Sequence, residues 1–354
     1  MPQAKPRPSG RPAPVLSVFI GRFQPFHLGH LHVVETGLAS TRHVLVLVGS
    51  AGQARSHRNP FTFAERATMI QRALGRPERV HIEPLLDHPY NDAQWMQDVQ
   101  ATVAATLKRL GHGEDAPVAL LGHCKDHTSY YLKLFPQWQG IEAQNIGNLS
   151  ATPMREALFA DPVAWLYTQA SHALPAEVHA FLTEFVGSPS YRALAEEYAF
   201  IHRYRQQWAA SPYPPTFVTV DACVVQSGHI LLVKRRSQPG EGLWALPGGF
   251  LHGQERIEDS MIRELREETR LKVPDPVLRG SIVTQRVFDD PHRSARGRTV
   301  THAFLIHLKP DLKLPEVKAA SDAREARWWP LAEICPDQMF EDHAAIIENL
   351  VALI

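Results

Sequence analysis

The chain is 354 residues long and carries 37 Lys and Arg residues against 37 Asp and Glu residues, so its formal net charge is zero. This length suggests two domains, each large enough to bury a core. Zero net charge removes the general attraction to phosphate on which nonspecific nucleic-acid binders depend. The three cysteines form neither a disulfide framework nor a zinc spacing, and no run of about 20 apolar residues could span a bilayer. We therefore expect a cytoplasmic protein that binds neither nucleic acid nor membranes.

Residues 1–14 are rich in proline and should form a disordered tail. The next segments alternate between apolar, β-branched runs and stretches of helical character. The runs lie at 15–20, 43–50, 79–82 and 118–121, and the helical stretches at 29–38, 63–74 and 92–110. Strand, turn, helix and strand in this order describe βαβ units. The sequence thus predicts a doubly wound α/β domain with a parallel sheet over residues 15–185.

An amphipathic pattern over 190–208 predicts a helix. Its stripe, which includes Tyr191 and Tyr198 and ends at Tyr204 or Arg205, favours core packing over cofactor contact. Prolines then end the helix, so we place a helical linker at 186–215. Residues 216–354 should form an α+β domain in which antiparallel strands surround one central helix. Its strands are predicted at 217–225, 229–236 and 301–308, and its helix at 255–269.

The sequence His27-Leu28-Gly29-His30 directly follows the first predicted strand and begins a helix. A helix N-terminus offers unpaired backbone N–H groups and a partial positive charge, which together favour phosphate binding. Two imidazoles three residues apart share one face of the first turn, and each can donate to a phosphate oxygen. Gly29 allows the backbone to approach a ligand closely. This segment predicts a phosphate site.

The segment GRFQPFHLGH resembles the first signature of the nucleotidyltransferase superfamily, in its nicotinamide-mononucleotide (NMN) adenylyltransferase branch. Ser150-Ala151-Thr152-Pro153-Met154-Arg155 resembles a second signature, with Leu149 where the family prefers isoleucine. The resemblance implies a Rossmann-like domain that transfers AMP from ATP to NMN with Mg²⁺, giving NAD and pyrophosphate. It implies catalytic roles for His27, His30 and Arg155, and binding of ATP and phosphate by Gly21, Arg22, Phe23, Gly29, Ser150 and Thr152.

The segment from Asp87 to Trp95 resembles the family's nicotinamide pocket, in which an aromatic ring stacks on the pyridinium. The resemblance implies NMN binding by Asp87, Asn91 and Trp95. A tryptophan at a helix start is also explained by core packing, and the choice between NMN and nicotinate mononucleotide stays open.

The segment 59–66 resembles a further family segment, although an ion pair between Glu65 and Arg66 on a helix face explains that pair of residues equally well.

Three glutamates lie close together on the central helix of the second domain. At ~100° per residue, Glu264, Glu267 and Glu268 share one arc, while the adjoining arc is apolar and should face the core. Like charges held so close repel one another unless a cation lies among them. Carboxylate oxygens suit Mg²⁺ or Mn²⁺. The helix thus predicts a divalent metal site.

The spacing Gly249-x5-Glu255-x7-Arg263-Glu264, continued by Glu267 and Glu268, resembles the Nudix box at every fixed position except the last glycine, which is Arg270 here. The resemblance implies an α/β/α sandwich that hydrolyses nucleoside diphosphates linked to another moiety, with Arg263 paired to Glu255. Flanking segments resemble the ADP-ribose pyrophosphatase group, whose products are AMP and ribose 5-phosphate. Arg293, Arg296 and Arg298 are either phosphate contacts or solvated side chains.

The order of the two domains resembles the bacterial bifunctional NMN adenylyltransferase/Nudix hydrolases. The expected partners are therefore the small molecules ATP, NMN, NAD and ADP-ribose, and the sequence is compatible with a homo-oligomer. The alternative is an ADP-ribose-sensing regulatory Nudix module fused to a nucleotidyltransferase of other substrate specificity. Related repressors need a winged-helix domain after the Nudix fold, and the 25 residues beyond Trp329 are too few for one.

Overall fold

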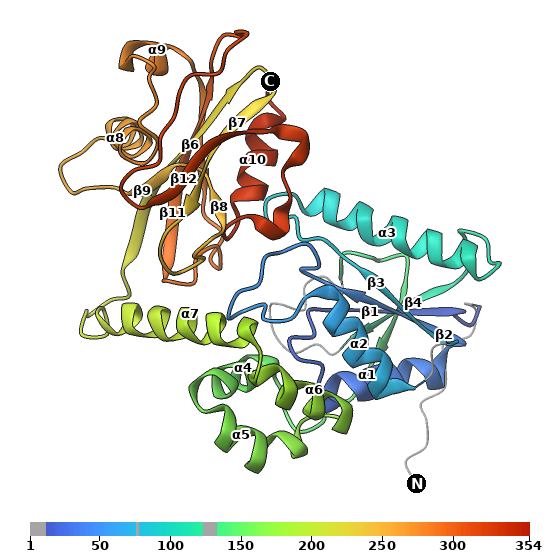
Figure 1. Ribbon diagram of the computed structural model, residues 1–354. Helices are drawn as coiled ribbons and strands as arrows, with labels where there is room; N and C mark the ends of the chain where they lie inside the picture. Colours follow the sequence, from blue (N-terminus) through green and yellow to red (C-terminus); the bar gives the residue numbers. More distant parts are fainter. Residues whose placement is uncertain (1–11, 76–77, 123–132) are drawn as a thin grey trace. The chain divides into compact units, whose positions relative to one another are not determined.

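The computed structural model describes residues 12–75, 78–122 and 133–354 (Figure 1). Most of the predicted proline-rich tail, and Cys124, lie outside the described residues. The chain divides into two compact units. The first contains residues 1–51, 60–87 and 93–188, and the second contains 52–59, 88–92 and 189–354. Among the described residues, no helix has the length and apolar character needed to cross a membrane.

The first unit is built on a five-stranded parallel sheet in the order β3-β2-β1-β4-β5. Its strands are β1 (Leu16–Gly21), β2 (His43–Val48), β3 (Val80–Pro84), β4 (Val118–Gly122) and β5 (Gln139–Glu142). The central strands are almost wholly buried, as expected where helices cover both faces of a parallel sheet. The strand order reverses between β1 and β4, and ligands of such folds bind beyond the carboxyl ends of strands at this point.

The helices of this unit are α1 (Leu28–Ser40), α2 (Phe63–Leu74), α3 (Asp92–Arg109), α4 (Ala151–Ala160), α5 (Pro162–Thr168) and α6 (Ala176–Val186). Helix α2 begins at a capping box, in which Thr62 and Glu65 each accept from the other's backbone N–H, and ends at Gly75 in the left-handed conformation. These local signals explain why its predicted and observed bounds agree.

The second unit contains a mixed seven-stranded sheet with the path β10-β11-β6-β7-β12, to which β8 and β9 add at β7 and β6. The strands are β6 (Thr216–Gln226), β7 (His229–Arg235), β8 (Trp244–Ala245), β9 (Gly248–Phe250), β10 (Ile282–Phe288), β11 (Arg298–His307) and β12 (Ala323–Pro330). The sequence predicts antiparallel strands, and in one respect this is wrong, because β6 and β11 run parallel over ten residue pairs.

Two separate cores lie on the two faces of this sheet. Along β6, Val220, Ala222 and Val224 belong to one core, whereas Cys223 and Val225 belong to the other, as the two-residue period of a strand requires. Helix α8 (Ile257–Thr269) covers the first face and α10 (His343–Val351) the second, which makes an α/β/α sandwich. The remaining helices are α7 (Pro189–Gln206) and α9 (Asp275–Gly280).

Candidate active sites

The turn from β1 into α1 holds two imidazoles in a fixed arrangement. The rings of His27 and His30 stack with centroids 3.6 Å apart and an interplanar angle of 18°. Each Nδ1 accepts a hydrogen bond of 3.3 Å from the other residue's backbone N–H, which forms a capping box at the start of α1. Because Nδ1 is the acceptor, the neutral tautomer of each ring carries its hydrogen on Nε2. Both rings thus present Nε2–H donors.

Close packing leaves little room around this turn. A Cβ atom on Gly29 would lie 3.1 Å from the His27 ring, and one on Gly21 would lie 2.8 Å from the ring of Phe23. Phe23 itself is buried and has a φ of 53°, which is uncommon for a residue other than glycine. The two glycines and Phe23 therefore shape the turn, while Arg22 follows Gly21 with an exposed side chain.

The two segments that resemble nucleotidyltransferase signatures meet in the structure. The guanidinium of Arg155 is buried, donates to the backbone oxygen of Gln24 at 2.7 Å, and donates to Thr152 Oγ1 at 3.2 Å. Ser150 occupies the N-cap position of α4, although its hydroxyl makes no capping hydrogen bond. Arg155 on α4 thereby joins the N-terminus of this helix to the turn that follows β1.

A functional role for Arg66 was not predicted. Its buried guanidinium donates to the backbone oxygens of Arg22 at 2.7 Å and Gly49 at 2.6 Å, while Glu65 instead bonds to Thr62. Burial lowers the pKa of Arg66 to about 10. Arg66 therefore connects the carboxyl ends of β1 and β2, and an ion pair on a helix face does not describe it.

The predicted NMN residues fall in two units. Asp87 accepts hydrogen bonds from the N–H and hydroxyl of Ser50, at 3.1 and 2.5 Å, just beyond the end of β2. Trp95 is partly buried against the core of the first unit, with its ring centroid 6.1 Å from that of Phe135. Asn91 lies in segment 88–92, which belongs to the second unit. The first unit therefore brings Asp87 to the carboxyl edge of its sheet and packs Trp95.

In the second unit, Arg263 holds the loop before α8 to the helix. Its Nε donates to Glu255 Oε1 at 2.7 Å and its Nη2 to Glu255 Oε2 at 3.0 Å, a bidentate pair. These hydrogen bonds lower the pKa of Glu255 to about 2. The helix begins at Ile257 and not at Glu255 as predicted, because Arg256 is the N-cap and has an extended backbone.

The three box glutamates differ in their surroundings. Glu268 is buried and accepts from the N–H of Gly248 at 3.0 Å, and a Cβ on Gly249 would lie 2.4 Å from Glu264 Oε1. Glu264 and Glu268 thus face β9. Glu267 has a side chain that is 48% exposed and pairs with Arg263 at 3.3 Å. Among the residues that the structure describes, no three acidic, histidine or cysteine side chains converge closely enough to enclose a metal ion.

Burial changes the acid–base properties of the two inward carboxyls. It raises the pKa of Glu268 to about 8 and also raises the pKa of Glu264. A neighbouring cation would offset this cost, and the hard oxygen donors suit a divalent ion. The donor set therefore fits the predicted metal, and both Glu264, at 2.8 Å, and Glu267, at 3.3 Å, would have to release Arg263 to join it.

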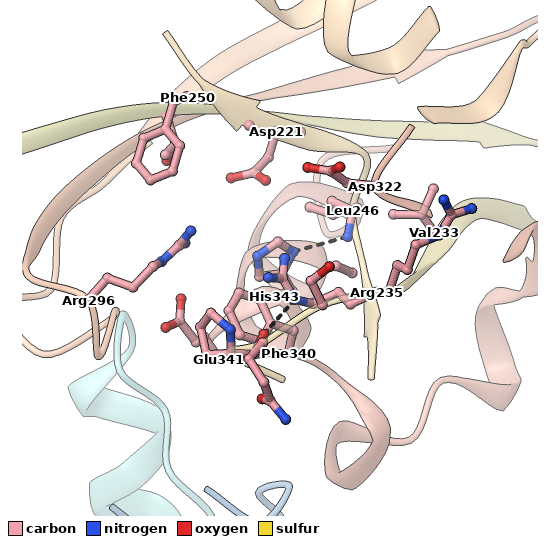
Figure 2. A pocket seen from close by; sticks show the side chains of 18 of the residues that line it. Asp221, Val233, Arg235, Leu246, Phe250, Arg296, Asp322, Phe340, Glu341 and His343 are labelled. Atoms are coloured by element: carbon pink, nitrogen blue, oxygen red, sulfur yellow. Dashed lines mark hydrogen bonds between the residues drawn. The ribbon is translucent and has the colours of Figure 1, made fainter. Parts of the chain in front are cut away.

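A cavity of about 250 Å³ opens beside Glu268, and Figure 2 shows side chains that line it. Glu268 and the two glycines of β9 line one part of it, and the aromatic rings of Phe200 and Tyr204 reach it from α7. Tyr191, Leu194 and Ile201 of the same helix are buried, as the prediction of core packing requires. Tyr204 therefore departs from that prediction, because its ring lines the cavity.

The arginines of loop 289–298 have different roles. Arg293 lines the cavity but pairs with Asp342, with both side chains buried. Arg298 donates to the backbone oxygen of Asp289. Arg296 lines the cavity and lies over the ring of Phe250, 5.0 Å from its centroid. Arg296 is thus the arginine of this loop that is best placed to meet an anion.

No sequence pattern singles out the segment 340–343, of which Phe340, Glu341 and His343 line another part of the cavity. Phe340 packs against the guanidinium of Arg235 at 4.0 Å, and Glu341 accepts from the N–H of Ala295 at 3.1 Å. His343 Nδ1 accepts from the N–H of Leu246 at 3.0 Å. A run of titratable residues directly before an apolar helix is the signal that could have drawn attention to it.

Two protein families match different parts of the chain. The family described as cytidylyltransferase-like matches residues 18–120, and the NUDIX domain family matches residues 215–350. The chain is 38% identical to a nicotinamide/nicotinic acid mononucleotide adenylyltransferase of Acinetobacter baylyi, over 51% of this chain and 92% of that protein. It is 36% identical to an ADP-ribose pyrophosphatase of Methanocaldococcus jannaschii, over 37% of this chain and 71% of that protein.

The comparison with solved structures also finds a match that extends over both units. It is the crystal structure of a bifunctional NMN adenylyltransferase/ADP ribose pyrophosphatase from Francisella tularensis, complexed with AMP and a manganese ion. The match has a TM-score of 0.88 and 35% sequence identity, and it covers 96% of this chain and 99% of that chain.

Proposed function

The chain belongs to the family of bifunctional NMN adenylyltransferase/ADP-ribose pyrophosphatases, and we propose that it carries out both reactions. The first unit transfers AMP from ATP to NMN, forming NAD and releasing pyrophosphate. The second unit hydrolyses ADP-ribose to AMP and ribose 5-phosphate. The observation that carries the proposal is that both signature sites are assembled on the two expected folds, in an order that one relative shares along 99% of its length.

In the first unit, catalysis depends on positioning. The phosphate of NMN attacks the α-phosphorus of ATP, and the bond to pyrophosphate breaks, so no protein nucleophile is needed. The Nε2–H groups of His27 and His30 and the positive end of the α1 dipole favour the negative charge that develops on the phosphates. Arg155 holds the turn in place through the backbone of Gln24.

In the second unit, Glu264, Glu267 and Glu268 would hold the divalent ion, Mg²⁺ or Mn²⁺. When bound, such an ion neutralises a diphosphate and lowers the pKa of a coordinated water. The chain's own residues prepare the site. The pair of Arg263 with Glu255 fixes the loop before α8, and β9 leaves space for the carboxylate of Glu264 because residue 249 is a glycine.

The direct test supplies the full-length protein and Mg²⁺ with ATP plus NMN, ATP plus nicotinate mononucleotide, or ADP-ribose, and identifies the products by chromatography. The second arm is included because the Acinetobacter relative is named for both mononucleotides. We expect NAD or its acid form from the first two arms, and AMP from the third. Absence of these products would refute the proposal.

Two variants separate the reactions. His30→Ala should lower NAD formation by at least ~10²-fold and leave ADP-ribose hydrolysis intact, because it removes a donor to the transferring phosphate. Glu267→Gln combined with Glu268→Gln should abolish hydrolysis and leave NAD formation intact. Loss of both activities in either variant would show that the two sites do not work independently.

A further inference from the structure

Two side chains at one part of the hydrolase cavity are held in fixed positions and have no place in the chemistry described above. Glu341 and His343 both line the cavity, and Figure 2 shows them close together on the segment that leads into α10. Between them, Asp342 is buried in its pair with Arg293. The segment therefore has little freedom to move, and its two outer side chains meet whatever fills the cavity.

Glu341 offers a hydrogen-bond acceptor. Its φ is 45°, a left-handed conformation that is unfavourable for a residue with a side chain. Its Oε1 accepts from the N–H of Ala295 at 3.1 Å. Within the described part of the chain, no protein group donates to Oε2. This oxygen is thus available to a ligand.

His343 offers a hydrogen-bond donor. Because its Nδ1 accepts from the N–H of Leu246, the neutral ring carries its hydrogen on Nε2. Burial lowers the pKa of this histidine to about 3, so the ring is neutral at physiological pH. Nε2 has no hydrogen-bond partner within the described part of the chain. The acceptor and the donor lie two residues apart in the sequence and face one cavity.

A vicinal diol matches this pair. One hydroxyl can donate to the carboxylate oxygen, and its neighbour can accept from the imidazole N–H. Glu268, beside which the proposed hydrolysis places the diphosphate, lines the same cavity as Glu341 and His343. A ribose attached to the diphosphate can therefore reach Glu341 and His343. We propose that Glu341 and His343 bind the vicinal diol of a ribose in the substrate and thereby determine specificity. This inference rests on the proposed hydrolysis of ADP-ribose.

ADP-ribose contains two riboses, so the test uses three substrates: ADP-ribose, the analogue that lacks the 2-hydroxyl of the adenosine ribose, and the analogue that lacks that of the terminal ribose. Glu341→Gln keeps the size of the side chain but replaces one acceptor oxygen with a donor. His343→Asn keeps an acceptor for the N–H of Leu246 and removes the Nε2–H donor. Glu348→Gln, at an exposed position of α10, is the control.

We expect wild-type kcat/KM to fall by ~10- to 100-fold for one of the two analogues, which identifies the ribose that is bound. Glu341→Gln should lower kcat/KM for ADP-ribose by ~10- to 100-fold and His343→Asn by ~3- to 10-fold. In both variants the penalty, meaning the ratio of kcat/KM for ADP-ribose to kcat/KM for that analogue, should be smaller than in the wild type. An unchanged penalty in both variants would overturn the proposal. So would an equal fall in kcat for all three substrates in Glu341→Gln, which would indicate that Glu341 acts on the attacking water.

Calorimetric titration with the same three compounds in the absence of divalent ions separates this inference from the proposed function. If wild-type protein does not hydrolyse ADP-ribose, the proposed function fails, and the affinities still decide whether the diol is bound. Weaker binding of one deoxy analogue that disappears in the variants supports the diol site. Equal affinity for all three compounds refutes it. Urea denaturation of each variant checks that the second unit has folded.

Discussion

Arg293 and Asp342 form a bidentate ion pair in which Nε and Nη2 each donate to a different carboxylate oxygen at 3.0 Å. The two side chains are only 3% and 8% exposed. Asp342 Oδ2 also accepts from the hydroxyl of Tyr90 at 2.5 Å, in the segment 88–92 that joins the second unit. This pair fixes the segment 340–343 to the loop that carries Arg296, and so it sets the shape of the cavity.

Breaking this pair should be costly, because the remaining charge stays buried without a partner. We expect Arg293→Gln to lower the free energy of unfolding by about 3–5 kcal/mol, measured by urea denaturation of the full chain. The control is Arg298→Gln, whose exposed partner Asp289 lies 3.7 Å away, and it should cost less than ~1 kcal/mol. Equal losses in the two variants would contradict the role of the buried pair.

The close approach of Gly249 to Glu264 gives a second prediction. A methyl group at residue 249 would lie 2.4 Å from Glu264 Oε1, so Gly249→Ala should displace this carboxylate from β9. We expect ADP-ribose hydrolysis to fall by at least ~10-fold and the Mg²⁺ concentration for half-maximal rate to rise. Gly253→Ala, where a Cβ meets open space, should leave both values unchanged. Similar kinetics in the two variants would show that the position of Glu264 is not limiting.

Restoring the glycine of the Nudix pattern at residue 270 should stabilise the protein. Arg270 ends α8 with a φ of 49°, a left-handed conformation in which glycine is not strained. Arg270→Gly should therefore raise the free energy of unfolding by about 1 kcal/mol, without changing hydrolysis, because the box glutamates lie upstream. Arg270→Ala keeps the Cβ and should gain nothing, so a similar gain from alanine would show that the side chain and not the backbone is responsible.

The parts of the molecule that the sequence predicts well are those specified locally. The capping box of Thr62 and Glu65 defines α2, and the spacing of Glu255 and Arg263 predicts a pair that the structure contains. Strand direction is different, because the parallel pairing of β6 with β11 joins residues about 80 positions apart. The cavity depends on similar long-range contacts. Glu341 and His343 accept hydrogen bonds from the backbone of Ala295 and Leu246, and no periodicity in the sequence predicts these contacts.

The buried imidazole of His343 should make stability depend on pH. In the folded protein burial lowers its pKa to about 3, whereas in the unfolded chain the ring binds a proton near its ordinary pKa of 6.5. Between these two pKa values the unfolded state binds more protons than the folded state. The contribution of His343 to the free energy of unfolding is therefore complete above pH 6.5, and it decreases as the pH falls, by up to ~1.4 kcal/mol per pH unit. His343→Asn removes this contribution. Urea denaturation from pH 7 to pH 5 should therefore show a shallower loss of stability in the variant than in the wild type, and parallel curves would contradict a neutral, buried imidazole.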